Sequence, residues 1–261
     1  MSEGMSGPGA RRAGAPLLAG ILLLAGECGA AASTGAPSVE ALLKSADAVR
    51  HPIDEGVIRV RTTVREPGAE PAISEVEVYV LGSDRSLCIF RTGPLQGRRI
   101  LSVGDRVWLI VPGSARAIPV NAGQRLLGGG SIADIARLKF AGAFDAVLRD
   151  EGETLEGVPC FVLDLTARSR KTEYAAATLW VGMRDTLPRV ARFTLRSGKE
   201  AKEVRYTAFG PAAGRTAVQR MEIAHLLPGE QGSQTTLEFI DYERRHLDPG
   251  LFEPAGARAA P

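Results

Sequence analysis

The stretch GRRILSVGDRVWLIVP, residues 97–112, decides the fold class of this 261-residue chain. Apolar residues at 100–103 and 107–111 predict two strands, and Gly104-Asp105 predicts the two-residue turn that joins them. Strands joined by so short a turn must run antiparallel. The stretch therefore predicts a hairpin within an antiparallel sheet.

A second segment, GGGSIADIARL at residues 128–138, follows this hairpin. Gly128, Gly129 and Gly130 predict a flexible hinge, and Ile135 and Leu138 repeat at helical spacing within a short amphipathic helix that ends near residue 140. The glycines are not a phosphate-binding loop, because no Gly-Lys-Ser/Thr ending follows them. We therefore expect a movable lid on one face of the sheet.

Strand patterns continue on both sides of the hairpin. Apolar and charged residues alternate at 58–64 and 75–80, and a further run covers 86–91. Seven later runs are separated by glycine, proline or charge clusters, at 144–150, 158–167, 172–183, 188–197, 199–209, 216–226 and 234–244. The chain is thus predicted to be mainly β with a few helices, as one strongly curved antiparallel sheet of about eleven strands. This incomplete barrel would have helices covering its concave apolar face.

The first helix is expected at residues 37–50. Val39, Leu42, Leu43, Ala46 and Val49 form one apolar stripe, Ser38 is a suitable N-cap, and Pro52 ends the helix.

The first 32 residues have the features of a secretory signal peptide. Arg11-Arg12 precedes an apolar run at 15–25, and small residues follow up to Ala32. Cys28 leaves a lipid-anchored form open, although Glu27 is a poor residue before an acylated cysteine. A disordered Ala/Gly tail is the other alternative. We expect a periplasmic protein with a single domain at 33–254 and a disordered tail at 255–261.

Residue chemistry argues against several function classes. The net charge of +2 and the scattered arginines give no case for nucleic-acid binding. His51, His225 and His246 lack partners at metal-ligand spacing, and no Gly-x-Ser-x-Gly motif is present. We therefore expect no enzyme activity, no metal and no cofactor. Cys88 and Cys160 could form a disulfide in an oxidising compartment, but buried free thiols are favoured.

Several segments together resemble the LolA/LolB-like family of outer-membrane lipoprotein-sorting proteins. The residues are 102–112 (SVGDRVWLIVP), 128–135, 157–163 (GVPCFVL), 179–181 and 197–199. The likeness extends loosely from the first helix to Phe252. It departs from the family where an arginine would help to hold the lid, because residues 80–84 read VLGSD and Arg85 is only nearby.

The resemblance implies a half-barrel whose apolar interior receives acyl chains, so that the protein carries lipids or lipoproteins toward the outer membrane. An inner-membrane exporter or an outer-membrane acceptor would be its partner. The alternative is a regulatory or scaffold protein of the envelope with the same fold. Candidate cavity residues are Ile58, Val60, Val78, Val80, Phe90, Ile100, Trp108 and Ile110, each of which could instead be plain core.

Overall fold

The computed structural model describes residues 36–104, 106–114, 116–120, 139–170, 172 and 174–260. The chain divides into two compact units, 1–36 and 37–261, and every described helix and strand lies in the second. The helical elements are α1 (Val39–Arg50), α3 (Phe140–Ala143), the 3-10 helix η1 (Pro249–Phe252) and α4 (Pro254–Ala259). The strands are β1 (Glu55–Arg65), β2 (Ala72–Leu81), β3 (Arg85–Phe90), β4 (Arg99–Val103), β5 (Arg106–Ile110), β6 (Ile118–Val120), β7 (Phe144–Leu155), β8 (Val158–Ala167), β9 (Ala176–Gly182), β10 (Pro188–Thr194), β11 (Glu200–Ala212), β12 (Arg215–His225) and β13 (Gln234–Glu243).

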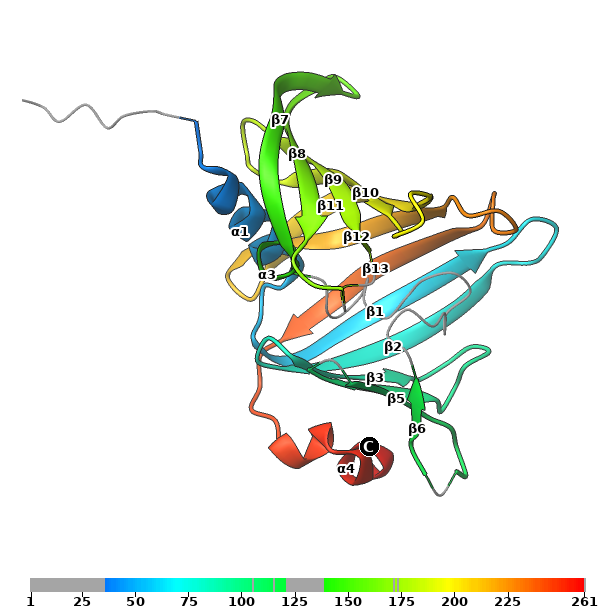
Figure 1. Cartoon of the computed structure of the whole chain (residues 1–261). Helices are drawn as coiled ribbons and strands as arrows, with labels where there is room; N and C mark the ends of the chain where they lie inside the picture. The colour runs from blue at the N-terminus through cyan, green and yellow to red at the C-terminus, as the bar shows by residue number, and fades with distance from the viewer. Residues whose placement is uncertain are drawn as a thin grey trace, which may run out of the picture. The chain divides into compact units, whose positions relative to one another are not determined.

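All thirteen strands belong to one antiparallel sheet, ordered β6-β5-β4-β3-β2-β1-β13-β12-β11-β10-β9-β8-β7. The chain runs outward from β1 to the β6 edge and returns from the β7 edge to β13, which pairs with β1. The sheet bends strongly between these edges and does not close (Figure 1). The predicted open, curved antiparallel sheet is thereby confirmed. β6 is a strand that the sequence did not predict.

The two faces of the sheet differ in how their apolar residues are grouped. One face gathers side chains from both ends of the sheet, such as Val76 from β2 and Leu163 from β8, into a single cluster. The opposite face carries two separate clusters, one over β1–β5 and one over β8–β10. A bent sheet brings its ends together only on the inside of the bend, so the continuous cluster marks the inner face.

Helix α1 packs on the inner face, as its apolar stripe predicts. Leu42, Leu43, Ala46 and Val49 are buried in the inner cluster. The Ser38 side chain accepts a hydrogen bond from the Ala41 N–H at 3.2 Å, so the predicted N-cap is confirmed.

The hairpin at the centre of the sequence forms as predicted, and its turn sets which residues face inward. Val103 pairs with Arg106, so two residues form the turn, and Gly104 has the positive φ of 53° that such turns require. Ile100 consequently lies opposite Leu109, and Leu101 lies opposite Trp108. Odd-numbered residues of β5 therefore share the inner face with even-numbered residues of β4.

The C-terminal segment covers the outer face, which corrects, for residues 255–260, the prediction of a disordered tail at 255–261. In Figure 1, α4 lies beneath β3 and β5. Phe252 and Ala257 are buried against Leu87 and Leu101, and the Arg99 guanidinium donates to the Ala257 carbonyl at 2.8 Å. Gly256 permits this packing, because a Cβ there would lie 1.9 Å from the Gly250 carbonyl oxygen. Tertiary contacts thus order a sequence whose composition alone predicts disorder.

Cys88 and Cys160 are free and buried, which confirms the favoured prediction. Burial raises the pKa of the Cys88 thiol to about 12, so almost no thiolate forms near neutral pH. We expect neither thiol to react with a thiol reagent within minutes at pH 8, and both to react after denaturation. Rapid labelling of the native protein by Ellman's reagent would contradict this.

Candidate functional site

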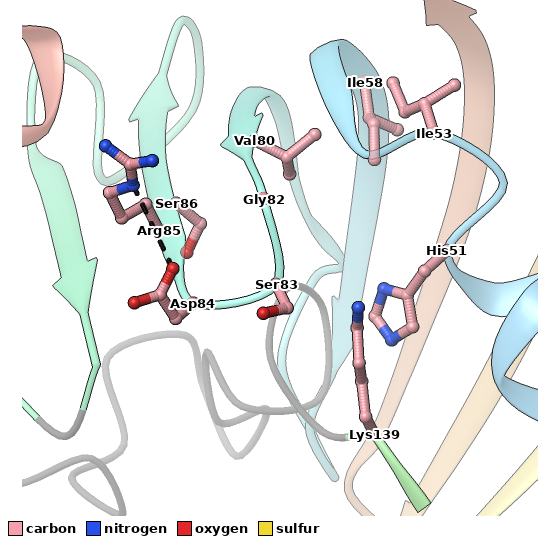
Figure 2. Close-up of a pocket in the computed structure, with 10 residues that line it drawn as sticks. All are labelled: His51, Ile53, Ile58, Val80, Gly82, Ser83, Asp84, Arg85, Ser86 and Lys139. Carbon is pink, nitrogen blue, oxygen red and sulfur yellow. Dashed lines mark ion pairs between the residues drawn. The ribbon is translucent and has the colours of Figure 1, made fainter. Parts of the chain in front are cut away.

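A pocket opens where the end of α1, the start of β1 and the β2–β3 turn meet Lys139. Its lining residues are His51, Ile53, Ile58, Val80, Gly82, Ser83, Asp84, Arg85, Ser86 and Lys139 (Figure 2). The enclosed part of the pocket is small, with a volume of about 20 Å³. This is room for roughly one water molecule.

Local sequence places each wall of the pocket. Helix α1 ends at Arg50, and the N–H of the next residue, His51, donates to the Asp47 carbonyl at 2.9 Å; Pro52 cannot continue the helix. The β2–β3 turn is tied to the entry of β1 by a 2.7 Å hydrogen bond from the Gly82 N–H to the Asp54 carbonyl. The two connections therefore hold the turn beside the start of β1.

The apolar wall of the pocket is continuous with the inner core. Ile53, Ile58 and Val80 line the pocket and belong to the inner cluster. Ile58 lies directly opposite Val78, and Val80 lies directly opposite Ser86. A ligand that enters past these side chains would reach the core of the sheet without crossing a polar layer.

The polar wall of the pocket carries more positive than negative groups. Among the described lining residues, Arg85 and Lys139 are cations and Asp84 is the one carboxylate, and the Arg85 guanidinium lies over the Phe252 ring on the outer face. The Asp84 carboxylate lies 3.9 Å from the Arg85 Nε, and both side chains are exposed. In Figure 2, Lys139 and His51 stand across the pocket from Arg85 and Asp84. The described lining residues therefore carry a net positive charge.

A buried carboxylate holds the backbone beside Lys139. Asp47 of α1 accepts hydrogen bonds from the Phe140 N–H at 2.8 Å and the Ala141 N–H at 2.9 Å. Its Oδ1 also lies 3.7 Å from the Arg50 guanidinium, and both side chains are almost inaccessible to solvent. Burial raises the pKa of the Asp47 carboxyl, against the opposing effect of Arg50. Asp47 thus fixes α3, and with it the position of Lys139 at the pocket.

The structure brings six of the eight predicted cavity residues together. Ile58, Val60, Val78, Val80, Phe90 and Ile100 all lie in the inner cluster. Only Ile58 and Val80 of these line the pocket, whereas the other four are at most 2% exposed and are packed in the core.

The prediction was wrong for Trp108 and Ile110. Both lie in the outer cluster with Leu101, on the face that the C-terminal segment covers. The two-residue turn is the cause, because it places Val107 and Leu109, not their even-numbered neighbours, on the face of Ile100. The predicted lid and hinge residues Gly128, Gly129, Gly130, Ile135 and Leu138 lie outside the described residues.

The sequence did not single out Ile53, Arg85, Ser86, Lys139 or the anchoring role of Asp47. Ser86 could have been found, because strand alternation places it on the face of Phe90. Across the described ranges, no group of three or more His, Cys, Asp and Glu residues could hold a metal ion. In the same ranges no helix is long and apolar enough to cross a membrane.

Comparisons with known proteins agree with this architecture. A family model described as an uncharacterized protein matches residues 82–256, more than half of the chain. A LolA superfamily protein from Nitrosomonas europaea, NE2245, is 26% identical, with a TM-score of 0.75 over 84% of this chain and 98% of that protein. No curated protein matches the chain.

Two further structures share the fold at lower identity. A DUF1329 family protein from Desulfovibrio piger is 18% identical, with a TM-score of 0.68 over 83% of this chain and 98% of that protein. An outer membrane lipoprotein-sorting protein domain from Vibrio parahaemolyticus is 16% identical, with a TM-score of 0.67 over 83% of this chain and 97% of that domain. The chain therefore belongs to the family that this model describes and is a LolA/LolB-like protein, as the resemblance in its sequence predicts.

Proposed function

We propose that this protein is a carrier that shelters the acyl chain of a lipid or lipoprotein in the inner face of its sheet. One observation carries the proposal: the apolar inner cluster reaches the surface at a pocket whose opposite wall is polar. An amphiphile has the same division, with its chain on one side and its headgroup on the other. The fold that the chain shares with the LolA superfamily protein supports the proposal.

The energetics of chain burial are favourable enough for a carrier. Each buried methylene contributes about 0.8 kcal/mol, so roughly ten methylenes contribute about 8 kcal/mol before the costs of ordering and association. The pocket is too small for such a chain. The carrier cycle therefore requires Ile53, Ile58 and Val80 to separate as the chain enters between them.

The proposal includes a location and partners. The N-terminal 32 residues would direct export and be removed, which leaves the carrier in the periplasm. It would receive its lipid from an inner-membrane exporter and deliver it to an outer-membrane acceptor.

The test is retention and binding of acyl ligands. Protein purified from the periplasm should release lipid on organic extraction, as detected by mass spectrometry, and should bind a fluorescent fatty-acid probe. Transfer of lipid between vesicles would separate a carrier from a regulatory or scaffold protein of the same fold. A well-folded protein that contains no lipid and binds no probe would overturn the proposal.

A paired substitution locates the binding to the pocket. Val80→Thr keeps the side-chain shape but adds a hydroxyl to the apolar wall, so we expect acyl-probe affinity to fall about fivefold or more. Val147→Thr is the matched control, because Val147 on β7 is 65% exposed. Equal probe affinity in both variants, with unfolding midpoints measured in parallel, would place the chain elsewhere.

A further inference from the structure

The pocket contains a buried hydroxyl group with no hydrogen-bond partner among the described residues. Ser86 lines the pocket and is 2% exposed, yet its Oγ makes no hydrogen bond there. Ser102, directly opposite on β4, also has an unpartnered buried hydroxyl but does not line the pocket. An unpaired buried hydroxyl is unfavourable, so the Ser86 hydroxyl is suited to donate to an oxygen atom of a ligand.

Charge adds a second, independent indication. Lys139 lines the same pocket as Ser86, and Asp84 is the one carboxylate among the described lining residues. The Arg85 Nε lies 3.9 Å from Asp84, and the Arg85 guanidinium lies over the Phe252 ring on the outer face, so Lys139 is the cation that the described residues offer to a ligand. Lysine and arginine bind phosphate and carboxylate oxygens through charge-assisted hydrogen bonds. The group that fits this wall is therefore an anion with several oxygen acceptors.

The apolar wall defines what the anion is attached to. Ile58 and Val80 lie on the inner side of the pocket, and Ser86 is paired in register with Val80. Figure 2 shows Ser86 on the strand beside that of Val80, with Lys139 across the pocket. An anionic group held at Ser86 would thus have its attached chain next to the entrance to the inner core.

We propose, on the basis of the carrier function above, that this pocket selects amphiphiles with an anionic headgroup, either a phosphate or a carboxylate. The Ser86 hydroxyl donates a hydrogen bond to one headgroup oxygen, and the Lys139 ammonium offsets the negative charge. Asp47 acts as a positioning residue, because it holds the backbone of residues 140 and 141 next to Lys139. A neutral headgroup of equal size gains nothing from Lys139 and binds more weakly.

The test compares ligands that share one acyl chain and differ in headgroup. Titration calorimetry on protein purified from the periplasm and freed of lipid would use a lysophosphatidic acid, the corresponding fatty acid and the corresponding monoacylglycerol, each below its micelle concentration. Inorganic phosphate without a chain is the fourth ligand. We expect at least one anionic lipid to bind about tenfold or more tightly than the monoacylglycerol, because hydrogen bonds to charged groups are the stronger ones.

Two variants assign this preference to named groups. Lys139→Ala and Ser86→Ala should each weaken binding of the anionic lipid about fivefold or more, with less than a twofold change for the monoacylglycerol. Ser102→Ala is the matched control for Ser86→Ala, because it removes an equally buried, unpartnered hydroxyl outside the pocket. Lys199→Ala is the control for charge, because Lys199 is exposed in the β10–β11 turn.

Folding does not confound the serine comparison. Removal of an unpartnered buried hydroxyl should leave the thermal midpoint unchanged or raise it, in both serine variants. Equal binding of anionic and neutral lipids would overturn the headgroup proposal and leave the carrier function standing. Failure of every acyl ligand to bind would overturn both. Inorganic phosphate that binds as tightly as the phospholipid would assign the site to free phosphate.

Discussion

Replacement of Asp47 with alanine is expected to lower the free energy of unfolding by about 3–5 kcal/mol, the typical cost of breaking a buried ion pair. The substitution removes the carboxylate that faces the buried Arg50 guanidinium and the acceptor of the Phe140 and Ala141 N–H groups. Urea unfolding followed by circular dichroism would measure the loss. Because domains are stable by about 5–15 kcal/mol, the variant should be marginal at 37 °C.

Two further variants control this experiment. Asp47→Asn retains one oxygen acceptor and should therefore be intermediate in stability. Glu40→Ala removes an exposed carboxylate of the same helix and should leave the unfolding curve unchanged. If Asp47→Ala unfolded at the same urea concentration as the wild-type protein, α3 would not depend on the carboxylate.

The pH dependence of the Asp47 contribution has an unusual sign. Burial raises the pKa of Asp47 in the folded protein, so the folded state holds the proton more tightly than the unfolded chain. The part of its contribution that is linked to proton binding is therefore fully present below the unfolded pKa of about 4 and is lost as the pH rises through the folded pKa. The free energy of unfolding of the wild type, relative to that of Asp47→Asn, should fall as the pH rises from about 4 through the folded pKa of Asp47. A difference that rises with pH would mean that Arg50 and the two N–H groups outweigh burial.

Deletion of residues 247–261 is expected to destabilise this unit strongly. It removes Leu247, Phe252, Ala257 and Ala260 from the outer cluster and uncovers Leu87 and Leu101, which are fully buried. Truncating a buried leucine or phenylalanine alone costs about 2–5 kcal/mol, so we expect a loss of about 5 kcal/mol or more. Insoluble expression, or a soluble protein that binds a hydrophobic dye, would show that the deletion has exposed the apolar outer face of the sheet.

Point substitutions separate packing from chain length. Phe252→Ala should lower the thermal midpoint strongly, whereas Glu253→Ala, at the exposed neighbouring position, should not. A truncated protein that stays soluble and as stable as the full chain would contradict the packing of this segment on the outer face.

The sequence predicted most of the fold because strand alternation, turn residues and the helix cap are local signals. The site was harder to predict because it depends on contacts between distant segments. Asp47 and Arg50 follow Leu43 at helical spacing, so a polar pair on the buried side of α1 could have been noticed. Nothing in the sequence near Asp47 indicates that its carboxylate oxygens accept hydrogen bonds from the N–H groups of residues 140 and 141. The ordered C-terminus likewise depends on Arg99, more than 150 residues earlier.

The error at Trp108 was avoidable. In a hairpin with a two-residue turn, opposite positions add up to an odd number, as 103 and 106 do here. The hairpins between β1, β2, β3 and β4 all pair even-numbered residues with even-numbered residues, such as Ile58 with Val78. Even-numbered residues therefore face inward up to β4, and odd-numbered residues do so on β5. The predicted turn already contained this switch.

The two-residue turn at Gly104 restricts which insertions this protein can accept. A substitution in β5 alters one side chain, but a one-residue insertion in the turn would exchange the faces of every residue that follows in the strand. Val107 and Leu109 would move outward, and Trp108 would move into the core beside Ile100. We therefore expect insertion scanning to tolerate added residues after Pro67, in the exposed β1–β2 connection, and to reject them between residues 103 and 106. Loop length at this one position is a stricter requirement than the identity of any residue in the strand it precedes.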